Sequence, residues 1–258
     1  AALWELRRAG LGWSVARASR GQAGARSTAT LRPCIGHLLF SGLALFVSQI
    51  AAVAVFQTDV IIVSVYFGPM QTAIYEVHAR LLGIPLVIQS IVLSSLWPAI
   101  AQGWAQKDLA WIVSTYRRAV ILCVAVMIPL VAVAVAGAPW IIPWWTGSGE
   151  LHADPLLTWS YAIFVASSLW AGLHATCLNA VGRVPFTAAI AAVQAVFNVI
   201  AVLLVVNWGV WAIAAASAGI ALLTNAIPLF WRWRTVMARS ETNCVGFSTS
   251  SVITDWSF

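Results

Sequence analysis

Charged residues are scarce in this sequence. Only 9% of the 258 residues are charged and 61% are hydrophobic, whereas roughly 25% of an average soluble domain is charged. The mean hydropathy is +0.89. This composition excludes a soluble domain. The net charge of +6 does not indicate a nucleic-acid surface, because no segment interleaves basic and aromatic residues densely. We therefore expect an all-α membrane protein that contacts membrane lipid and binds no nucleic acid.

Catalytic motifs are missing too. The sequence has no HExxH, no GxSxG, no Walker loop and no pair of intramembrane aspartates, which argues against the enzyme classes that use them. Its four cysteines have no CxxC spacing, so neither a disulfide framework nor a metal site is indicated. We expect a protein that is not an enzyme and that holds no cofactor or metal.

An initiator methionine is also lacking, since the first methionine is Met70. Residues 1–35 do not show the short apolar core and small-residue cleavage site of a signal peptide. We expect the sequence to be a fragment of a longer protein whose missing part lies upstream.

What the sequence does have is long apolar runs. Hydropathy predicts a basic leader at 1–35, a six-helix transmembrane bundle at 36–236 and a polar, disordered tail at 237–258. The six predicted spans are 36–66, 71–103, 108–145, 153–181, 184–207 and 209–231. Glycine, proline and asparagine separate the blocks, for example Gly68 and Pro69 between the first two.

The basic residues predict the orientation of these spans. If the leader is cytoplasmic, six alternating spans place 13 of the 14 Arg and Lys residues on the cytoplasmic side. Tryptophans cluster near the predicted span ends, as at Trp104, Trp144 and Trp208, which is typical of an aromatic belt. We expect a multi-pass protein of the bacterial inner (plasma) membrane with both termini in the cytoplasm.

Three residues of fixed charge lie well inside the apolar spans: Asp59, Glu76 and Arg80. Each costs about 2.5–3.5 kcal/mol at a helix centre, so such residues normally face a polar cavity or a partner. Glu76 and Arg80 are spaced i, i+4, which lets a helical pair meet. Asp59 is predicted at a similar depth in the preceding span, so we expect it to contact Arg80.

Small or polar residues continue these helix faces as stripes. The predicted substrate pathway adds the following residues to the three charged ones: Ser48, Thr72, Ser90, Ser94, Gln194, Asn198 and Asn225. Such stripes also occur as plain helix–helix contact faces, with Asn or Gln as interhelical hydrogen-bonding residues. Both interpretations stay open at this point.

The order of several short motifs resembles one transporter family. "DVIIVSVYFGPMQTAIYEVHARL" is similar to a pattern in the polysaccharide and oligosaccharide-lipid flippases of the multidrug/oligosaccharidyl-lipid/polysaccharide exporter superfamily. Its matching positions are Asp59, Gly68, Tyr75, Ala79, Arg80 and Leu81. "LWPAIAQGWAQKDL", "PWWTG", "LNAVGRVPF" and "NWGVWAIAAASAG" resemble later parts of the same pattern. The resemblance covers residues 36–236 and fits the C-terminal six-helix half best.

The resemblance implies half of a transporter of twelve or more helices, whose partner is a missing N-terminal six-helix half. The implied substrate is a lipid-linked saccharide on polyprenyl diphosphate, flipped by alternating access for surface polysaccharide synthesis. Asp59 would pair with Arg80 or take up a coupling proton or sodium ion. Two alternatives remain: half of a cation-coupled multidrug exporter, and a truncated membrane protein that transports nothing.

Overall fold

The computed structural model describes residues 31–147 and 151–238 and divides the chain into two units, residues 1–43 and 44–258. The first unit contributes only the start of a helix, and the second holds all the remaining elements. The predicted leader lies outside the described residues up to residue 30, and the predicted tail does so from residue 239. The contacts below all belong to the second unit.

Every regular element in the described ranges is helical, with no strand among them, so the all-α class is confirmed. The elements are, in order, α3 (Leu31–Ala105), α4 (Leu109–Leu122), the π-helical turn η2 (Cys123–Met127), α5 (Ile128–Thr146), α6 (Pro155–Ala180), α7 (Val184–Val205), the 3-10 turn η3 (Val206–Trp208), α8 (Val210–Ile220), the π-helical turn η4 (Ala221–Ala226) and a helical continuation over 227–238. The elements α4, η2 and α5 follow one another without a break, as do α8, η4 and the continuation.

The longest element, α3, is a helical hairpin. Gly68 interrupts it with φ 80° and ψ 179°, a conformation that is essentially confined to glycine. Tyr75 Oη lies 3.3 Å from Asp59 Oδ2, whereas 16 residues of straight helix would separate them by about 24 Å. The chain therefore reverses at Gly68, where the sequence predicted a turn. We call residues 31–67 the first arm and residues 69–105 the second arm of α3.

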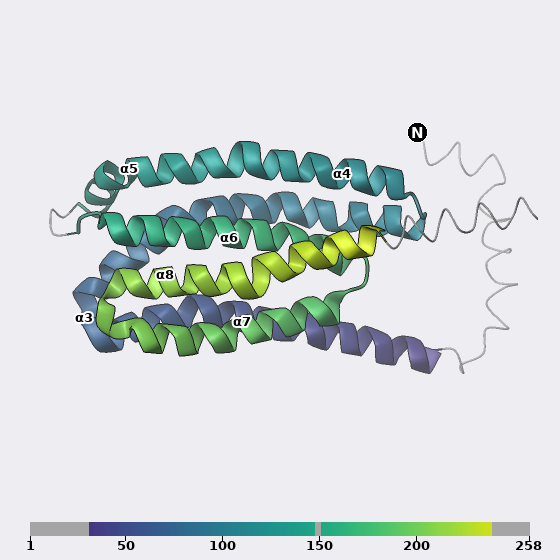
Figure 1. Cartoon of the computed structure of the whole chain (residues 1–258), viewed down its shortest axis with the longest axis horizontal. Helices are drawn as coiled ribbons and strands as arrows, with labels where there is room; N and C mark the ends of the chain where they lie inside the picture. The colour runs from purple at the N-terminus through teal and green to yellow at the C-terminus, as the bar shows by residue number, and fades with distance from the viewer. Residues whose placement is uncertain (1–30, 148–150, 239–258) are drawn as a thin grey trace, which may run out of the picture. The chain divides into compact units, whose positions relative to one another are not determined.

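Five helices in the described ranges are long and apolar enough to cross a membrane, with the α3 hairpin counted once. They are Leu39–Ala105, Leu109–Thr146, Pro155–Ala180, Val184–Trp208 and Val210–Ala238. The chain is thus a multi-pass helical membrane protein. Of these helices α6 is the most enclosed, with 61% of its apolar window buried, and it packs against α8 (Figure 1).

Two acidic residues outside the apolar stretches begin helices. The side chain of Asp108 accepts a hydrogen bond from Trp111 N at 3.0 Å, and that of Asp154 accepts one from Leu156 N at 2.9 Å. Each satisfies a backbone N–H that the first turn of a helix leaves free. These caps set where α4 and α6 begin.

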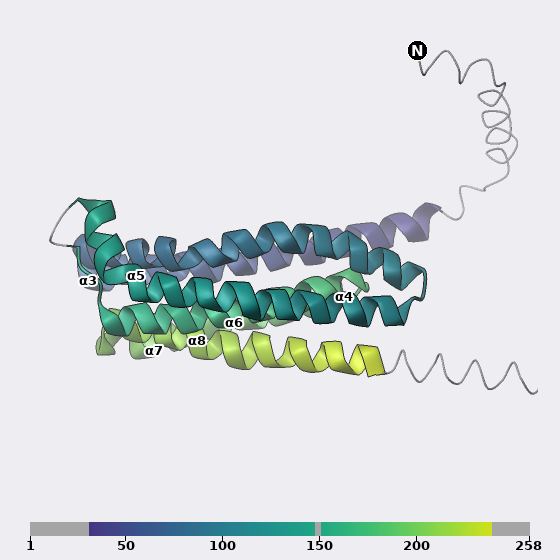
Figure 2. The same ribbon diagram turned by 90° about the horizontal axis from the view of Figure 1, so that it is seen from above.

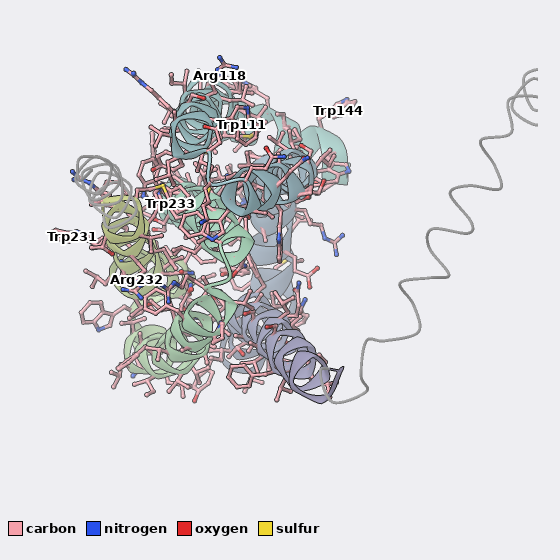
Figure 3. All side chains as sticks on the ribbon, turned by 90° about the vertical axis from the view of Figure 1, so that its right-hand side faces the viewer. Trp111, Arg118, Trp144, Trp231, Arg232 and Trp233 are labelled. Carbon is pink, nitrogen blue, oxygen red and sulfur yellow. The ribbon has the colours of Figure 1, made fainter. Side chains whose placement is uncertain are left out.

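The described helices run antiparallel between two ends of the bundle. The connections α3–α4 and α6–α7 lie at the same end as the last helical residues, and the turns at Gly68, α5–α6 and α7–α8 lie at the other end (Figures 1 and 2). The first end carries basic residues, namely Lys107, Arg183, Arg232 and Arg234, and Arg117 and Arg118 follow in the third turn of α4. Figure 3 views this end and labels Arg118 and Arg232. Basic residues therefore gather at one end of the bundle.

Candidate functional site

Asp59 is a buried carboxylate held by neutral donors. Only 3% of the residue is exposed. Its Oδ2 accepts hydrogen bonds from Ser217 Oγ at 2.6 Å and Tyr75 Oη at 3.3 Å, and its Oδ1 accepts one from Asn198 Nδ2 at 3.0 Å. The donors come from α8, the second arm of α3 and α7 respectively. The contacts of Asp59 thus tie four helical segments together without a positive charge.

The predicted contact between Asp59 and Arg80 is wrong. Arg80 Nη2 pairs with Glu76 Oε2 at 2.8 Å, and the two side chains are 70% and 39% exposed. Glu76 lies one turn before Arg80 on the same helix face and reaches it without rearrangement, while Asp59 is turned toward α7 and α8. The three charges therefore form two separate features: an accessible ion pair and a buried carboxylate.

Asn198 completes the oxygen-rich surroundings of Asp59. Because its Nδ2 donates to the carboxylate, its Oδ1 must point elsewhere. That oxygen is buried and accepts no hydrogen bond from any described residue. Carboxylate, amide and hydroxyl oxygens are ligands that suit a proton or a hard cation such as sodium.

One cavity holds the ion pair. It has a volume of about 480 Å³ and lies between the two arms of α3 and α6. Its polar lining residues are Gln57, Tyr75, Glu76, Arg80 and Tyr161. We call it the charged cavity. Tyr75 lines the charged cavity and also donates to Asp59. The Tyr75 side chain therefore lies between the cavity and the buried carboxylate.

A second cavity has mostly apolar walls with amides and hydroxyls among them. It has a volume of about 310 Å³ and is bordered by both arms of α3, α6, α7 and η4. Its polar lining residues are Gln89, Ser90, Ser168, Gln194 and Asn225. We call it the amide cavity. Phe56 and Leu86 line both cavities, so the two are neighbours that share a wall.

The predicted pathway residues divide among these features. Glu76 and Arg80 line the charged cavity, and Ser90, Gln194 and Asn225 line the amide cavity. Ser48, Thr72 and Ser94 line neither cavity. Their hydroxyls donate to carbonyls of their own helix, of Ala44 at 3.1 Å, Gly68 at 2.9 Å and Ile91 at 2.7 Å. A role of these three in a pathway stays a prediction.

Sequence reasoning missed Gln89 and Ser217. Gln89 is buried and its Nε2 donates to Leu169 O at 2.7 Å, which links the second arm of α3 to α6. The feature that could have identified Gln89 is that it is a lone amide in an apolar span. Membrane helices use such amides for contacts with each other. Ser217 lies in the run "AIAAASAG", where nothing distinguishes a hydroxyl that donates to a carboxylate from any other small residue.

Apart from the oxygen atoms around Asp59, the described ranges show no cluster of side chains that could bind a metal ion. No group of three or more His, Cys, Asp or Glu side chains lies close enough together to hold a metal ion. Cys123 and Cys177 are buried free thiols.

Comparison with known proteins gives a match to one sequence family and a shared fold with two solved structures. A sequence profile of the family described as "Polysaccharide biosynthesis protein" matches residues 26–150. No curated protein matches the sequence. Two solved structures share the fold. One is a MATE protein in complex with MaL6 (TM-score 0.70, 14% identity) and the other is a proline-to-alanine mutant of MATE (TM-score 0.72, 13% identity).

Each alignment covers 82% of this chain and 48% of the MATE chain. The chain thus spans about half the length of the solved chains that it matches. The resemblance first drawn from the motifs around Asp59 and Arg80 is confirmed in these terms: the chain matches a polysaccharide biosynthesis family over residues 26–150 and shares its fold with the two MATE structures.

Proposed function

We propose that this chain is one six-helix half of a membrane exporter that flips an oligosaccharide linked to polyprenyl diphosphate across the bacterial inner membrane. The observation that carries the proposal is the Glu76–Arg80 pair. It lies within an apolar span, remains accessible and lines a cavity of about 480 Å³. Charge in such a place indicates a polar occupant. The match to a polysaccharide biosynthesis family supports a saccharide as part of that occupant.

Each arm of α3 makes one crossing in this proposal, which gives six spans. An arm of 37 residues is about 55 Å long, more than the roughly 30 Å of a bilayer core. The basic residues at one end of the bundle, such as Lys107 and Arg183, support a cytoplasmic location for that end. Both termini are then cytoplasmic.

A second six-helix bundle is the proposed partner. The 48% coverage of each MATE chain supports this arrangement. The headgroup of the substrate passes through a polar space between the bundles by alternating access, while the polyprenyl tail stays in the lipid.

The charged side chains have distinct roles in this mechanism. Arg80 attracts the diphosphate, because a guanidinium suits phosphate oxygens in charge and geometry. Glu76 holds the Arg80 side chain in place through its 2.8 Å contact. Asp59 takes up the coupling proton or sodium ion, with Tyr75 joining its site to the charged cavity.

A cation-coupled multidrug exporter is the second candidate. The observation that favours it is the MATE fold together with a buried carboxylate that has only neutral donors. Arg80 argues against it, because a positive charge in the cavity repels a cationic drug. The third candidate is a truncated protein that transports nothing.

The test is a flipping assay. The chain is reconstituted in vesicles, alone and together with the polypeptide encoded directly upstream, with a fluorescent prenyl-diphosphate oligosaccharide in the lipid. We expect flipping in the combined sample and its loss in the Arg80→Gln variant. Export of a cationic dye with no flipping supports the multidrug candidate, and absence of both activities supports the third.

A further inference from the structure

We infer that the amide cavity binds an uncharged sugar ring of the substrate. The inference rests on the proposed function and adds a substrate class and a second binding site to it. It is drawn from the free hydrogen-bonding atoms, the charge and the size of the cavity.

The amides that line the cavity have hydrogen-bonding capacity left over. Asn225 Nδ2 donates to Gln194 Oε1 at 2.5 Å. This contact leaves Asn225 Oδ1 as an acceptor and Gln194 Nε2 as a donor, and no described residue bonds to either. Gln194 is only 7% exposed, and neither atom is sealed away from open space. Both residues line the amide cavity, so a ligand there has these free atoms within its walls.

Gln89 adds a second acceptor. Its Nε2 is engaged by Leu169 O at 2.7 Å and by Cys123 Sγ at 3.4 Å, while its Oε1 has no hydrogen bond from the described chain. That oxygen lies 3.5 Å from the point where a Cβ on Gly172 would stand, and Gly172 lines the cavity. Since Gly172 has no side chain, the oxygen remains open toward the cavity.

The lining favours a ligand that is polar but neutral. Within its apolar walls it holds free amide donors and acceptors, and none of its residues is charged. The hydroxyls of Ser90 and Ser168 donate to carbonyls of their own helices, so each can still accept a hydrogen bond. Sugar hydroxyl groups both donate and accept, so they match this mixture. A carboxylate or a cation would lose its hydration there without gaining a counter-charge. An uncharged sugar is therefore favoured over a uronic acid or a cationic drug.

The size and the apolar walls fit one ring. A volume of about 310 Å³ would hold about ten waters at roughly 30 Å³ each, which is the size class of a single hexose. Phe56 and Phe164 both line the cavity and make an edge-to-face contact with ring centroids 5.4 Å apart. Such rings offer an apolar surface for the C–H face of a sugar.

The two cavities are placed to receive two parts of one ligand. Phe56 and Leu86 line both the amide cavity and the charged cavity, where Arg80 lies. A diphosphate bound at Arg80 and a sugar ring next to it are covalently adjacent in a lipid-linked saccharide. The charged cavity thus takes the diphosphate and the amide cavity takes a neutral ring attached to it.

Binding of three matched probes to the purified full chain in nanodiscs tests the inference. The probes are a short prenyl diphosphate, the same compound carrying a neutral hexose, and the same compound carrying the corresponding uronic acid. The test variant is Gln194→Leu/Asn225→Leu. It removes both members of a hydrogen-bonded pair, so neither is left with a lost partner. The control variant is Gln49→Leu, which changes an amide on the first arm of α3 that lines neither cavity.

For the wild-type chain we expect the neutral-hexose probe to bind about tenfold more tightly than the sugar-free probe, and the uronic-acid probe to gain no such advantage. The double variant should lose the advantage of the hexose yet bind the sugar-free probe as before, which also shows that it is folded. Gln49→Leu should behave as the wild type.

Three results overturn the inference. If the wild type binds the sugar-free and hexose probes equally, or if the double variant keeps the hexose advantage, the amide cavity does not bind the sugar, although the proposed function stands. If none of the three probes binds to the wild type, the proposed function fails and takes this inference with it.

Discussion

Asn198 Nδ2 donates a 3.0 Å hydrogen bond to Asp59 Oδ1 and joins α7 to the first arm of α3 across 139 residues of sequence. Ser217 Oγ adds the shorter contact, 2.6 Å, from α8. A carboxylate bound in this way has a structural role, because it collects donors from several helices. It also keeps a negative charge inside the bundle, and the two roles respond differently to substitution.

Asp59→Asn should separate these two roles. The amide keeps one oxygen to accept from Ser217 or Asn198 but carries no charge. We therefore expect the variant to fold, with a melting temperature within a few degrees of the wild type, and to lose ion-coupled flipping. The measurements are thermal unfolding in detergent and the vesicle assay under a proton or sodium gradient. Full gradient-driven flipping by Asp59→Asn would show that the charge is not needed.

Asp59→Leu is the matched comparison for the structural role. It leaves the donors of Tyr75, Asn198 and Ser217 without their acceptor, and each such loss costs about 1–3 kcal/mol in a buried place. We expect a clear fall in the melting temperature and in yield. A variant as stable as Asp59→Asn would contradict the structural role of the hydrogen bonds.

Arg80→Gln should change binding without changing stability. The Arg80–Glu76 pair is largely exposed, and exposed pairs typically contribute about 0–1 kcal/mol. We expect an unchanged melting temperature and, because a hydrogen bond to a charged group contributes about 1.5–3 kcal/mol, a loss of roughly ten- to a hundredfold in affinity for a prenyl diphosphate. Titration of the purified chain with a fluorescent prenyl diphosphate measures this.

Glu76→Gln provides the control for Arg80→Gln. It removes the negative charge beside the guanidinium but keeps an amide oxygen that can accept from Arg80 and hold it in place, so the diphosphate should bind at least as tightly as to the wild type. Equal losses of affinity in both variants would mean that the ion pair acts by holding the local structure and not by attracting the ligand.

Much of the fold could be predicted from local sequence signals. Gly68 and Pro69 predicted the reversal within α3, and the apolar runs predicted the helices, because hydropathy and turn chemistry act over short distances. The helix bounds in the structure lie within a few residues of the predicted blocks, except that α3 begins at Leu31 and the last helix continues to residue 238.

The partners of the charged residues were harder to predict. Depth along a helix placed Asp59 and Arg80 at a similar level, but depth does not define the face on which a side chain lies. Glu76, on the same helix, offered Arg80 a closer partner. Two of the donors to Asp59 come from helices far along the chain. The rotation of these helices about their axes decides whether Asn198 and Ser217 face Asp59. No local sequence signal predicts that rotation.

Gly68→Ala should destabilise the hairpin. Open space surrounds the position, so no clash arises, but its φ of 80° with ψ of 179° strains any residue with a side chain by about 1–3 kcal/mol. We expect a melting temperature several degrees lower. Gly219→Ala is the control, because that glycine also has nothing within 4 Å but has no positive φ. Equal effects of the two substitutions would show that alanine adopts the backbone conformation of Gly68 without strain.

Cysteine labelling should establish the orientation of the bundle. Cys123 and Cys177 are buried and should not react, so a chain with Cys34→Ser and Cys244→Ser provides an unreactive background. Single cysteines are then introduced as Gln106→Cys and Arg183→Cys at the basic end, and as Trp208→Cys at the other end, where Trp208 is 71% exposed.

With a membrane-impermeant maleimide applied to intact spheroplasts, we expect labelling of Trp208→Cys alone. The other two should react only after lysis, because the positive-inside rule places the basic end in the cytoplasm. Labelling of Gln106→Cys together with Trp208→Cys would mean that the second arm of α3 does not cross the membrane. Labelling of Gln106→Cys and Arg183→Cys without Trp208→Cys would mean that the orientation is the reverse of the proposed one. Arg80 would then face the cytoplasmic leaflet. Lipid-linked saccharides would have to enter at the end of the bundle opposite the basic residues.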